Sequence, residues 1–422
     1  MTRTMLANAT LFDGERHHGD RRFAIGVDGS RIAFVREGPQ CEEPGYRSID
    51  LAGKLVLPGF IDAHTHATGA SLDVATLDAQ PPSYLTSHAA RFLGRMVQQG
   101  FTTIRDAGGG DVGLVRAIEE GLVDGPRYRV AGKGLSQTGG HGDLRGQRES
   151  EPCACAFSGV FSRVVDGPEQ VRVAVRDQFR MGAHQVKIFV SGGVLSPTDP
   201  IWMLQFNDAE VSVAVEEAAR WRSYIMAHAH TKEAILRCAR LGVRSIEHAT
   251  LLDREAADVV AEHGTFIVPT IGVIDAMLRH AQSLPAGALA KLEPVVDAAY
   301  RAIGHAEAAG CSIGFGSDLL GSLQGGEAGE FAARAALGST LQVLRSATSV
   351  NARLMGLQDT VGHIKAGHEA DLVVADARVM NDLALLSKDD TVELVLIAGK
   401  PRRDIRHVFC IGLAAGTRPH AI

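Results

Sequence analysis

The chain has 422 residues, of which 43 are Lys or Arg and 49 are Asp or Glu, so its formal net charge is −6 at pH 7. This balance, without a basic block, argues against nucleic acid as a partner. The first residues form no apolar signal segment, and no uninterrupted apolar run approaches the roughly 18 residues of a membrane span, so we expect a cytoplasmic protein that does not act at membranes. The length suits a barrel of about 250 residues or more with a smaller companion domain.

Both ends of the chain contain short strands separated by turns. Examples are residues 22–35 near the amino terminus and residues 370–375 near the carboxyl terminus. We expect residues 1–54 and 360–422 to form one small β-sandwich domain together. Residues 55–359 are then left for a second domain.

The apolar run 55–66 opens this second domain and ends in two histidines, His64 and His66. Side chains at positions i and i+2 of a strand point to the same face, so these imidazoles can bind one metal ion. Such pairs also occur as solvated residues. The metal hypothesis therefore depends on further candidates along the chain.

Strand-like and helix-like segments alternate through the rest of this domain. After residues 55–66, we expect strands at 101–106, 128–135, 185–191, 224–230, 244–248, 265–269 and 311–318. Helix-like segments separate them, at 112–121, 170–181, 208–221, 232–241, 254–263 and 289–309. This pattern predicts an α/β fold, a (β/α)8 TIM-like barrel over residues 55–359, with its chemistry at the carboxyl ends of the strands.

Further candidate ligands lie in or at the ends of these strands. Lys187 is in the fourth strand, His228 and His230 are in the fifth, His248 ends the sixth and Asp318 ends the eighth. Imidazole and carboxylate groups without a paired thiolate suit Zn²⁺ or a similar divalent ion. A buried lysine among cations has a lowered pKa, and its neutral amine can react with carbon dioxide to give a carbamate that bridges two metals. Two ions about 3.5–4 Å apart could hold a hydroxide and polarise a carbonyl.

These motifs resemble those of the metal-dependent amidohydrolase superfamily over essentially the whole chain. The segments that carry the resemblance are 58–66, 186–188, 227–230, 245–248, 316–318 and the tail 367–374. Within the superfamily, the chain is most similar to binuclear Xaa-Pro and Xaa-Arg/Lys dipeptidases, a branch that also includes ochratoxin-hydrolysing amidases. Residues 135–145 are similar to a loop of that branch.

The resemblance implies two divalent ions as cofactors, most simply Zn²⁺. The implied metal ligands are six residues: His64, His66 and Asp318 on the first ion, His228 and His248 on the second, and the carbamate of Lys187 between the two ions. Family members place the fifth-strand ligand about twenty residues before the sixth-strand histidine, which favours His228 over His230.

The resemblance also implies catalytic and substrate-binding roles. Asp318 would be the general base, taking a proton from the bridging hydroxide and passing it to the leaving amine. His141 would stabilise the carbonyl oxygen or bind the substrate carboxylate. His230 and Trp202 are the further substrate-binding candidates.

The resemblance therefore predicts a hydrolase that cleaves the amide bond to a C-terminal amino acid. Dipeptides, N-acyl amino acids and ochratoxin-type amides are the candidate small-molecule substrates, and a homo-oligomer is expected. The alternatives are a mononuclear cyclic amidohydrolase or deaminase like imidazolonepropionase, a hydrolase of urea or carbamate xenobiotics, and a scaffold protein without activity. Lys187 argues against a mononuclear enzyme, and the complete ligand set argues against a scaffold.

The sequence leaves the side-chain preference open. An Arg or Lys side chain in the substrate would need an acidic partner, for which Asp143, Asp199 and Asp275 are candidates in predicted loops. An aromatic leaving group would instead need an apolar pocket, to which Trp202, Met203 and Phe206 could contribute.

Overall fold

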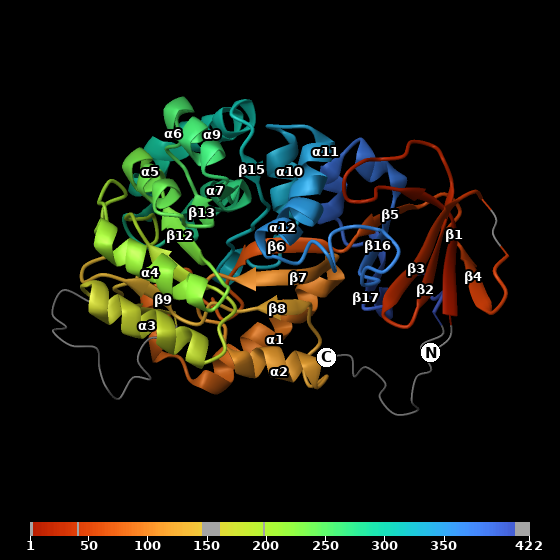
Figure 1. Cartoon of the computed structure of the whole chain (residues 1–422), viewed down its shortest axis with the longest axis horizontal. Coiled ribbons are helices and arrows are strands. Elements are labelled where there is room, and N and C mark those ends of the chain that lie inside the picture. The colour runs from red at the N-terminus through yellow and green to blue at the C-terminus, as the bar shows by residue number, and fades with distance from the viewer. Residues whose placement is uncertain (1–2, 40–41, 146–160, 197–198, 410–422) are drawn as a thin grey trace.

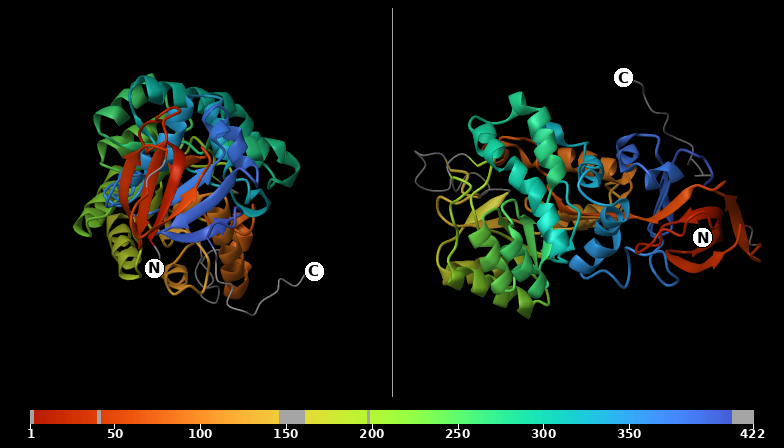
Figure 2. Two further views of the ribbon diagram at one scale, coloured as in Figure 1. Left: turned by 90° about the vertical axis from the view of Figure 1, so that its right-hand side faces the viewer. Right: turned by 90° about the horizontal axis from the view of Figure 1, so that it is seen from above.

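The computed structural model describes residues 3–39, 42–145, 161–196 and 199–409. A barrel surrounded by helices and a smaller β domain lie side by side (Figure 1). The strands of the β domain come from both ends of the chain, so its red and blue segments lie together (Figure 2). Among the described residues, no helix combines the length and the apolar character needed to cross a membrane.

The β domain confirms the prediction that both termini build one unit. Its sheet has the order β18-β17-β16-β5-β1-β2-β3, and β4 also pairs with β1. The strands are β1 (Arg3–Leu11), β2 (Phe23–Asp28), β3 (Arg31–Glu37), β4 (Tyr46–Asp50), β5 (Leu55–Pro58), β16 (Leu372–Ala375), β17 (Val392–Ile397) and β18 (Lys400–Asp404). Alternate residues of β1, β2 and β16, such as Leu6, Ile25 and Leu372, are buried in one core.

The run 55–66 is two strands rather than the single strand expected. β5 pairs with β1 and β16 of the terminal sheet, whereas β6 (Phe60–Thr65) begins the barrel. Gly59 lies between them, and a Cβ there would come within 2.1 Å of the Thr102 hydroxyl oxygen. A glycine therefore lets the chain pass closely from one sheet to the other.

The barrel is confirmed as a ring of parallel strands. Its strands are β6, β7 (Phe101–Asp106), β8 (Arg127–Arg129), β9 (Gly134–Ser136), β11 (Val186–Phe189), β12 (Ile225–Ala229), β13 (Ser245–His248), β14 (Phe266–Val268) and β15 (Ser312–Ile313). The third expected strand is interrupted, with β8 pairing with β7 and β9 pairing with β11. The ring closes where the Ala63 amide donates to the Phe315 carbonyl at 2.8 Å.

A further short strand, β10 (Ser162–Val164), pairs with β9 and was not expected. The helices are α1 (Pro82–Gln98), α2 (Val112–Glu119), α3 (Pro168–Arg180), α4 (Asp208–Arg220), α5 (Lys232–Arg240), α6 (Arg254–Glu262), α7 (Ile271–Arg279), α8 (Ala288–Leu292), α9 (Val296–Ala308), α10 (Gly329–Ala335), α11 (Thr340–Arg345) and α12 (Asn351–Leu354). The helix expected over 289–309 is divided into α8 and α9, and α7 was not expected.

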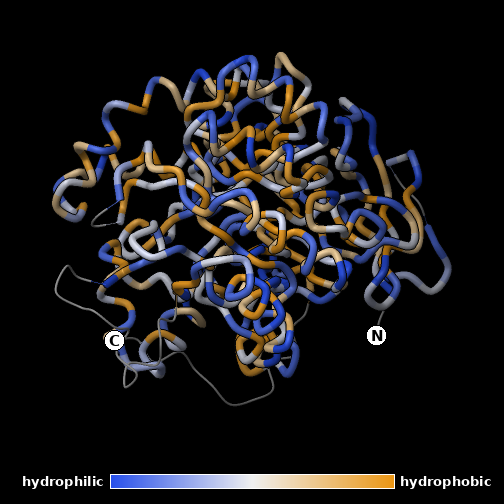
Figure 3. Tube along the Cα trace, turned by 60° about the vertical axis from the view of Figure 1, so that its left-hand side comes forward, coloured by the Kyte–Doolittle hydropathy of each residue, from blue (hydrophilic) through white to orange (hydrophobic). Residues whose placement is uncertain are grey.

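The helices surround the barrel and pack on it through small apolar residues. Ala214 and Ala218 of α4 and Ala234 of α5, for example, are buried against the strands. Hydrophobic and hydrophilic residues alternate along the trace at short intervals, as amphipathic elements require (Figure 3). This packing fixes the carboxyl ends of the strands around a common centre.

Candidate active site

A pocket at the carboxyl ends of the barrel strands collects nearly all the predicted site residues. It contains about 860 Å³ that protein atoms do not fill. The predicted residues that line it are His64, His66, His141, Lys187, His228, His230, His248 and Asp318. Residues separated by up to 254 positions in the sequence thus share one pocket, as a barrel face allows.

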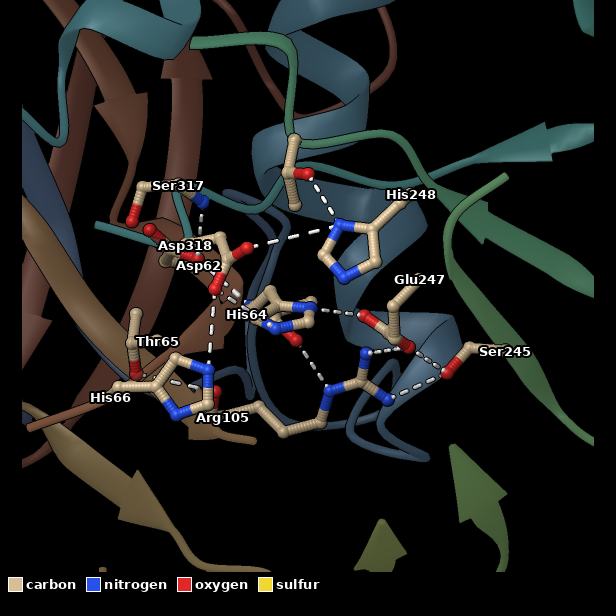
Figure 4. A network of polar contacts seen from close by, with 12 residues as sticks. Asp62, His64, Thr65, His66, Arg105, Ser245, Glu247, His248, Ser317 and Asp318 are labelled. Carbon is tan, nitrogen blue, oxygen red and sulfur yellow. Dashed lines mark hydrogen bonds and ion pairs between the residues drawn. The ribbon is translucent and has the colours of Figure 1, made fainter. Parts of the chain in front are cut away.

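His64, His66 and Asp318 form the first group of donors in this pocket. The Nε2 atoms of His64 and His66 lie 3.3 Å and 3.2 Å from the same Asp318 oxygen, Oδ1. The other oxygen, Oδ2, lies 3.8 Å from Nδ1 of His248 (Figure 4). A single carboxylate therefore contacts imidazoles from strands β6 and β13.

The second group consists of His228, His230 and His248. One nitrogen from each lies within 4.8 Å of the others, and the same is true of the donor atoms of His64, His248 and Asp318. His248 belongs to both groups, which places two potential metal positions next to each other. The geometry includes His230 in the second group, so it does not by itself choose His228 over His230.

Each imidazole of the first group has a polar partner at Nδ1, on the side of the ring away from Asp318. His64 Nδ1 lies 2.7 Å from Glu247 Oε2, and His66 Nδ1 lies 3.0 Å from the Gly108 carbonyl oxygen. Similar contacts orient metal-binding histidines in proteins generally, because they fix the tautomer and the direction of the other nitrogen. Here they leave Nε2 of both rings for a ligand.

Glu247 and Arg105 form a buried ion pair beneath the histidines that we did not predict. Arg105 Nη2 donates to Glu247 Oε1 at 2.9 Å, and its Nε donates to the Ala63 carbonyl at 2.6 Å (Figure 4). Both side chains are fully buried. Burial alone would raise the pKa of Glu247, but Arg105 and His64 outweigh it and lower that pKa to about 2. The sequence signal that could have identified this ion pair was Glu247, a carboxylate directly before His248 in an otherwise apolar strand.

The protonation states of the histidines and of Asp318 in the pocket suit metal binding. Burial is the main cause that lowers the pKa of His228 and His248, and it lowers the pKa of His230 to about 3. The pKa of Asp318 lies well below its usual value, because its histidine partners outweigh burial. Neutral imidazoles and an ionised carboxylate are the forms that bind metals.

Lys187 is 2% exposed and lines the same pocket. Among the described residues it forms no ion pair, and burial lowers its pKa to about 8 against the attraction of Glu247 and Asp318. An unpaired buried cation is costly. The pocket therefore combines imidazoles, a carboxylate and an amine, and its described lining includes no thiolate. This combination of donors suits divalent metal ions.

The backbone at this end of the barrel is strained. His248, Ala249, Thr270 and Asp318 all have positive φ, between 47° and 73°. L-residues adopt this region at a cost, and such residues concentrate at functional sites. Two of these residues, His248 and Asp318, line the pocket.

His141 lies over the second group of histidines. Its ring stacks on that of His228 with a centroid distance of 4.3 Å, and its Nδ1 lies 3.4 Å from Asp199 Oδ2. Gly193 makes room for it, because a Cβ there would come within 2.3 Å of the His141 ring. His230 Nδ1 lies 2.6 Å from the hydroxyl oxygen of Thr250.

Trp202 does not lie in the pocket. Its side chain is 75% exposed, and it is not among the lining residues. Phe206 is buried but does not line the pocket either. The geometry therefore gives no support to Trp202 as a substrate contact, and we leave it out of the proposed site.

The acidic candidates also lie outside the pocket lining. Asp143 binds Arg145, Asp199 accepts hydrogen bonds from the Gly193 amide and the Gln205 side chain, and Asp275 binds Tyr300. The wall around the metal-binding candidates is instead apolar. It comprises Val74, Leu144, Phe161, Phe189, Val194, Leu195, Val273, Ile274, Met277, Leu292, Val295 and Leu320.

Comparison with known proteins identifies relatives for nearly the whole chain. Residues 55–402 match the amidohydrolase family. The chain is 30% identical over 401 residues to ochratoxinase from Aspergillus niger, covering 90% of this chain and 82% of that protein.

Two solved structures are similar throughout. A prolidase complexed with N-methylphosphonate-L-proline is 42% identical with a TM-score of 0.91, and the match covers 95% of this chain and 99% of the prolidase. A Xaa-Pro dipeptidase with methionine bound in its active site is 30% identical with a TM-score of 0.83, and the match covers 94% and 99% of the two chains.

Proposed function

Because the chain belongs to the amidohydrolase family and is a hydrolase of amide bonds, we propose that it releases a C-terminal amino acid with an apolar side chain from dipeptides or N-acyl amino acids. The observation that carries this proposal is the pocket itself. A cluster of histidines, Lys187 and Asp318 forms its polar part, and the remaining described lining residues are almost all apolar. Ligand pockets commonly combine an apolar wall with a few polar groups that set orientation.

Two divalent ions, most simply Zn²⁺, would bind to this polar part. His64, His66 and Asp318 would hold one ion, and His228 and His248 would hold the other. Lys187, as its carbamate, would contact both, and this would give the buried amine an anionic form with cationic partners. When bound, the ions would supply an activated water nucleophile and polarise the carbonyl group.

Asp318 would move the proton. Its Oδ1 is shared by the Nε2 atoms of His64 and His66, whereas Oδ2 is farther from the histidine nitrogens. Oδ2 is therefore the atom suited to accept a proton from the attacking water and pass it to the leaving amine nitrogen. Its low pKa keeps it ionised before the reaction.

His141 and His230 would orient the substrate. Asp199 lies near Nδ1 of His141, so Nε2 is the nitrogen available to donate a hydrogen bond to the carbonyl oxygen or to the substrate carboxylate. Thr250 holds His230 in the same manner. The apolar wall would hold the side chain of the amino acid and exclude water from the bond that breaks.

The expectation that the protein forms a homo-oligomer also stays a prediction.

The test is a matched series of substrates that differ only in the C-terminal amino acid. N-acetyl and glycyl derivatives of Phe, Leu, Pro, Lys and Asp would be incubated with the metal-loaded protein, and the released amino acid would be measured. We expect kcat/KM for the apolar residues to exceed that for Lys and Asp at least tenfold. A preference for Lys or Asp, or no release from any member, would contradict the proposal.

A further inference from the structure

A second pocket lies at the amino-terminal ends of β11, β12 and β13, next to the last residue of β8. It contains about 850 Å³ and is lined by Arg129, His184, Gln185, Arg222, Ser223, Tyr224, Arg244, Met355, Gly356 and Leu357. None of these residues is acidic, and none lines the candidate active site. We call this pocket the arginine pocket.

Two of its arginines form no ion pair. Among the residues that the structure describes, no carboxylate lies within 4.0 Å of the guanidinium nitrogens of Arg129 or Arg222, and Glu119 acts on Arg129 only from a longer distance. Burial and the nearby Arg127 lower the pKa of Arg129. Arg129 is partly buried, and a partly buried guanidinium group without an ion-pair partner is costly to keep in place, whereas Arg222 is exposed at the mouth of the pocket.

The third arginine is fixed without being neutralised. Arg244 Nε and Nη2 donate to the carbonyl oxygens of Leu354 and Arg353 at 2.6 Å and 2.5 Å. Its guanidinium carbon lies 5.5 Å from the centre of the Tyr224 ring. Carbonyls and an aromatic ring orient this cation, but they leave its full positive charge at the pocket wall.

His184 adds a neutral hydrogen-bond donor. The Val130 amide donates to His184 Nδ1 at 3.1 Å, so the proton of the neutral ring lies on Nε2. Burial and the adjacent Arg129 lower the pKa of His184 to about 4. The ring therefore stays neutral near pH 7 and presents an N–H group.

Arg222 occupies a position that glycine fills elsewhere in this chain. Two residues after the end of α1, α2, α3, α5, α6, α9 and α12, the chain has a glycine with φ between 64° and 93°. Two residues after the end of α4, it has Arg222 with φ 54°. Glycine adopts this backbone conformation without the steric cost that a side chain brings. The chain thus carries an arginine at the pocket in spite of a local cost to stability.

We propose that the arginine pocket binds a small phosphate-type oxyanion, either inorganic phosphate or the phosphoryl group of a phosphomonoester. Guanidinium groups bind such anions through paired N–H donors, and several of them together favour a dianion over a single carboxylate. The volume suits a small molecule, since ligand pockets typically span about 300–1,000 Å³. The proposal does not depend on the proposed hydrolytic function.

The test measures binding of inorganic phosphate and of glycerol phosphate to the full-length, metal-loaded protein. Isothermal titration calorimetry and thermal denaturation would be carried out at constant ionic strength, with KCl as the balancing salt. We expect saturable binding of one oxyanion per chain and a rise in Tm. Tighter binding of glycerol phosphate would identify an organic phosphate as the ligand, and tighter binding of inorganic phosphate would identify the free ion.

Variants locate the binding. Arg129→Ala and Arg222→Gly should each weaken binding at least tenfold, and Arg222→Gly should fold because glycine suits its backbone. Arg240→Ala, which removes an exposed arginine from the end of α5, should bind as the wild type does. A phosphate effect no larger than that of KCl would overturn the proposal. Unchanged binding in both pocket variants would also overturn it, because the oxyanion would then be at the metal site.

Discussion

The two ends of the barrel differ in how they balance charge. At the carboxyl end, the histidines contact Asp318 and Glu247, and Glu247 is itself paired with Arg105. At the amino-terminal end, Arg129, Arg222 and Arg244 gather without a carboxylate in the pocket lining. The carboxyl end offers nitrogen and oxygen ligands for cations, and the amino-terminal end offers N–H hydrogen-bond donors for anions. The same strands therefore support two opposite kinds of chemistry at their two ends.

The largest effect at the carboxyl end is expected from Lys187→Ala. If the carbamate of Lys187 contacts both ions, the variant should lose bound metal and activity together. Metal analysis and amino-acid release from one preparation would measure both, with the exposed Lys365→Ala as the control. A variant that stays fully active with two bound metals would show that Lys187 carries no carbamate.

Asp318→Asn should separate metal binding from turnover. The amide still offers an oxygen ligand, but it cannot carry the proton from water to the leaving amine. We expect most of the metal to be retained and kcat to fall by about 10²–10⁴-fold, the usual contribution of a general acid or base. The exposed Asp359→Asn is the control. An unchanged kcat would mean that another group moves the proton.

Glu247→Gln tests whether the buried ion pair supports the site. The substitution leaves the Arg105 charge unpaired, which in buried pairs costs about 3–5 kcal/mol, and weakens the contact that orients His64. Loss of such supporting contacts typically lowers metal affinity about 10–100-fold. Denaturant unfolding and competition with a metal chelator would measure the two effects. Wild-type metal affinity in this variant would show that His64 needs no support from Glu247.

The smallest effect is expected at the opposite end of the barrel. In phosphate-free buffer, Arg222→Gly should stabilise the protein by about 0.5–1 kcal/mol, because it removes a side chain from a left-handed backbone conformation. The reciprocal variant Gly242→Arg, at the matching position after α5, where φ is 83°, should destabilise it by a similar amount. Thermal denaturation of the two variants compares them directly. A less stable Arg222→Gly would mean that Arg222 makes a stabilising contact of its own.

The sequence predicted which residues gather at the carboxyl end of the barrel, because they occur in short motifs at strand ends, whereas their roles stay predictions. His64, His66, Lys187, His228, His248 and Asp318 were all expected, and all line one pocket. The expected strands were less accurate where glycines let the chain change direction. Gly59 separates β5 from β6, and residues 130–133 separate β8 from β9.

Other features could not be predicted because they depend on contacts between distant segments. Arg105 and Glu247 are 142 positions apart and form their ion pair only when β7 and β13 lie in one barrel. The arginines of the second pocket come from the end of β8 and from the turns before β12 and β13, which share no motif. Trp202 was expected at the substrate because it follows the fourth strand, but its side chain faces solvent.

The most direct test of the central claim is a metal titration of the metal-free protein. Zn²⁺ would be added in steps while the release of phenylalanine from N-acetyl-L-phenylalanine, or of proline from glycyl-proline, is followed. The account predicts that activity rises to a plateau at two equivalents of metal per chain. A plateau at one equivalent, or release that needs no metal, would contradict it.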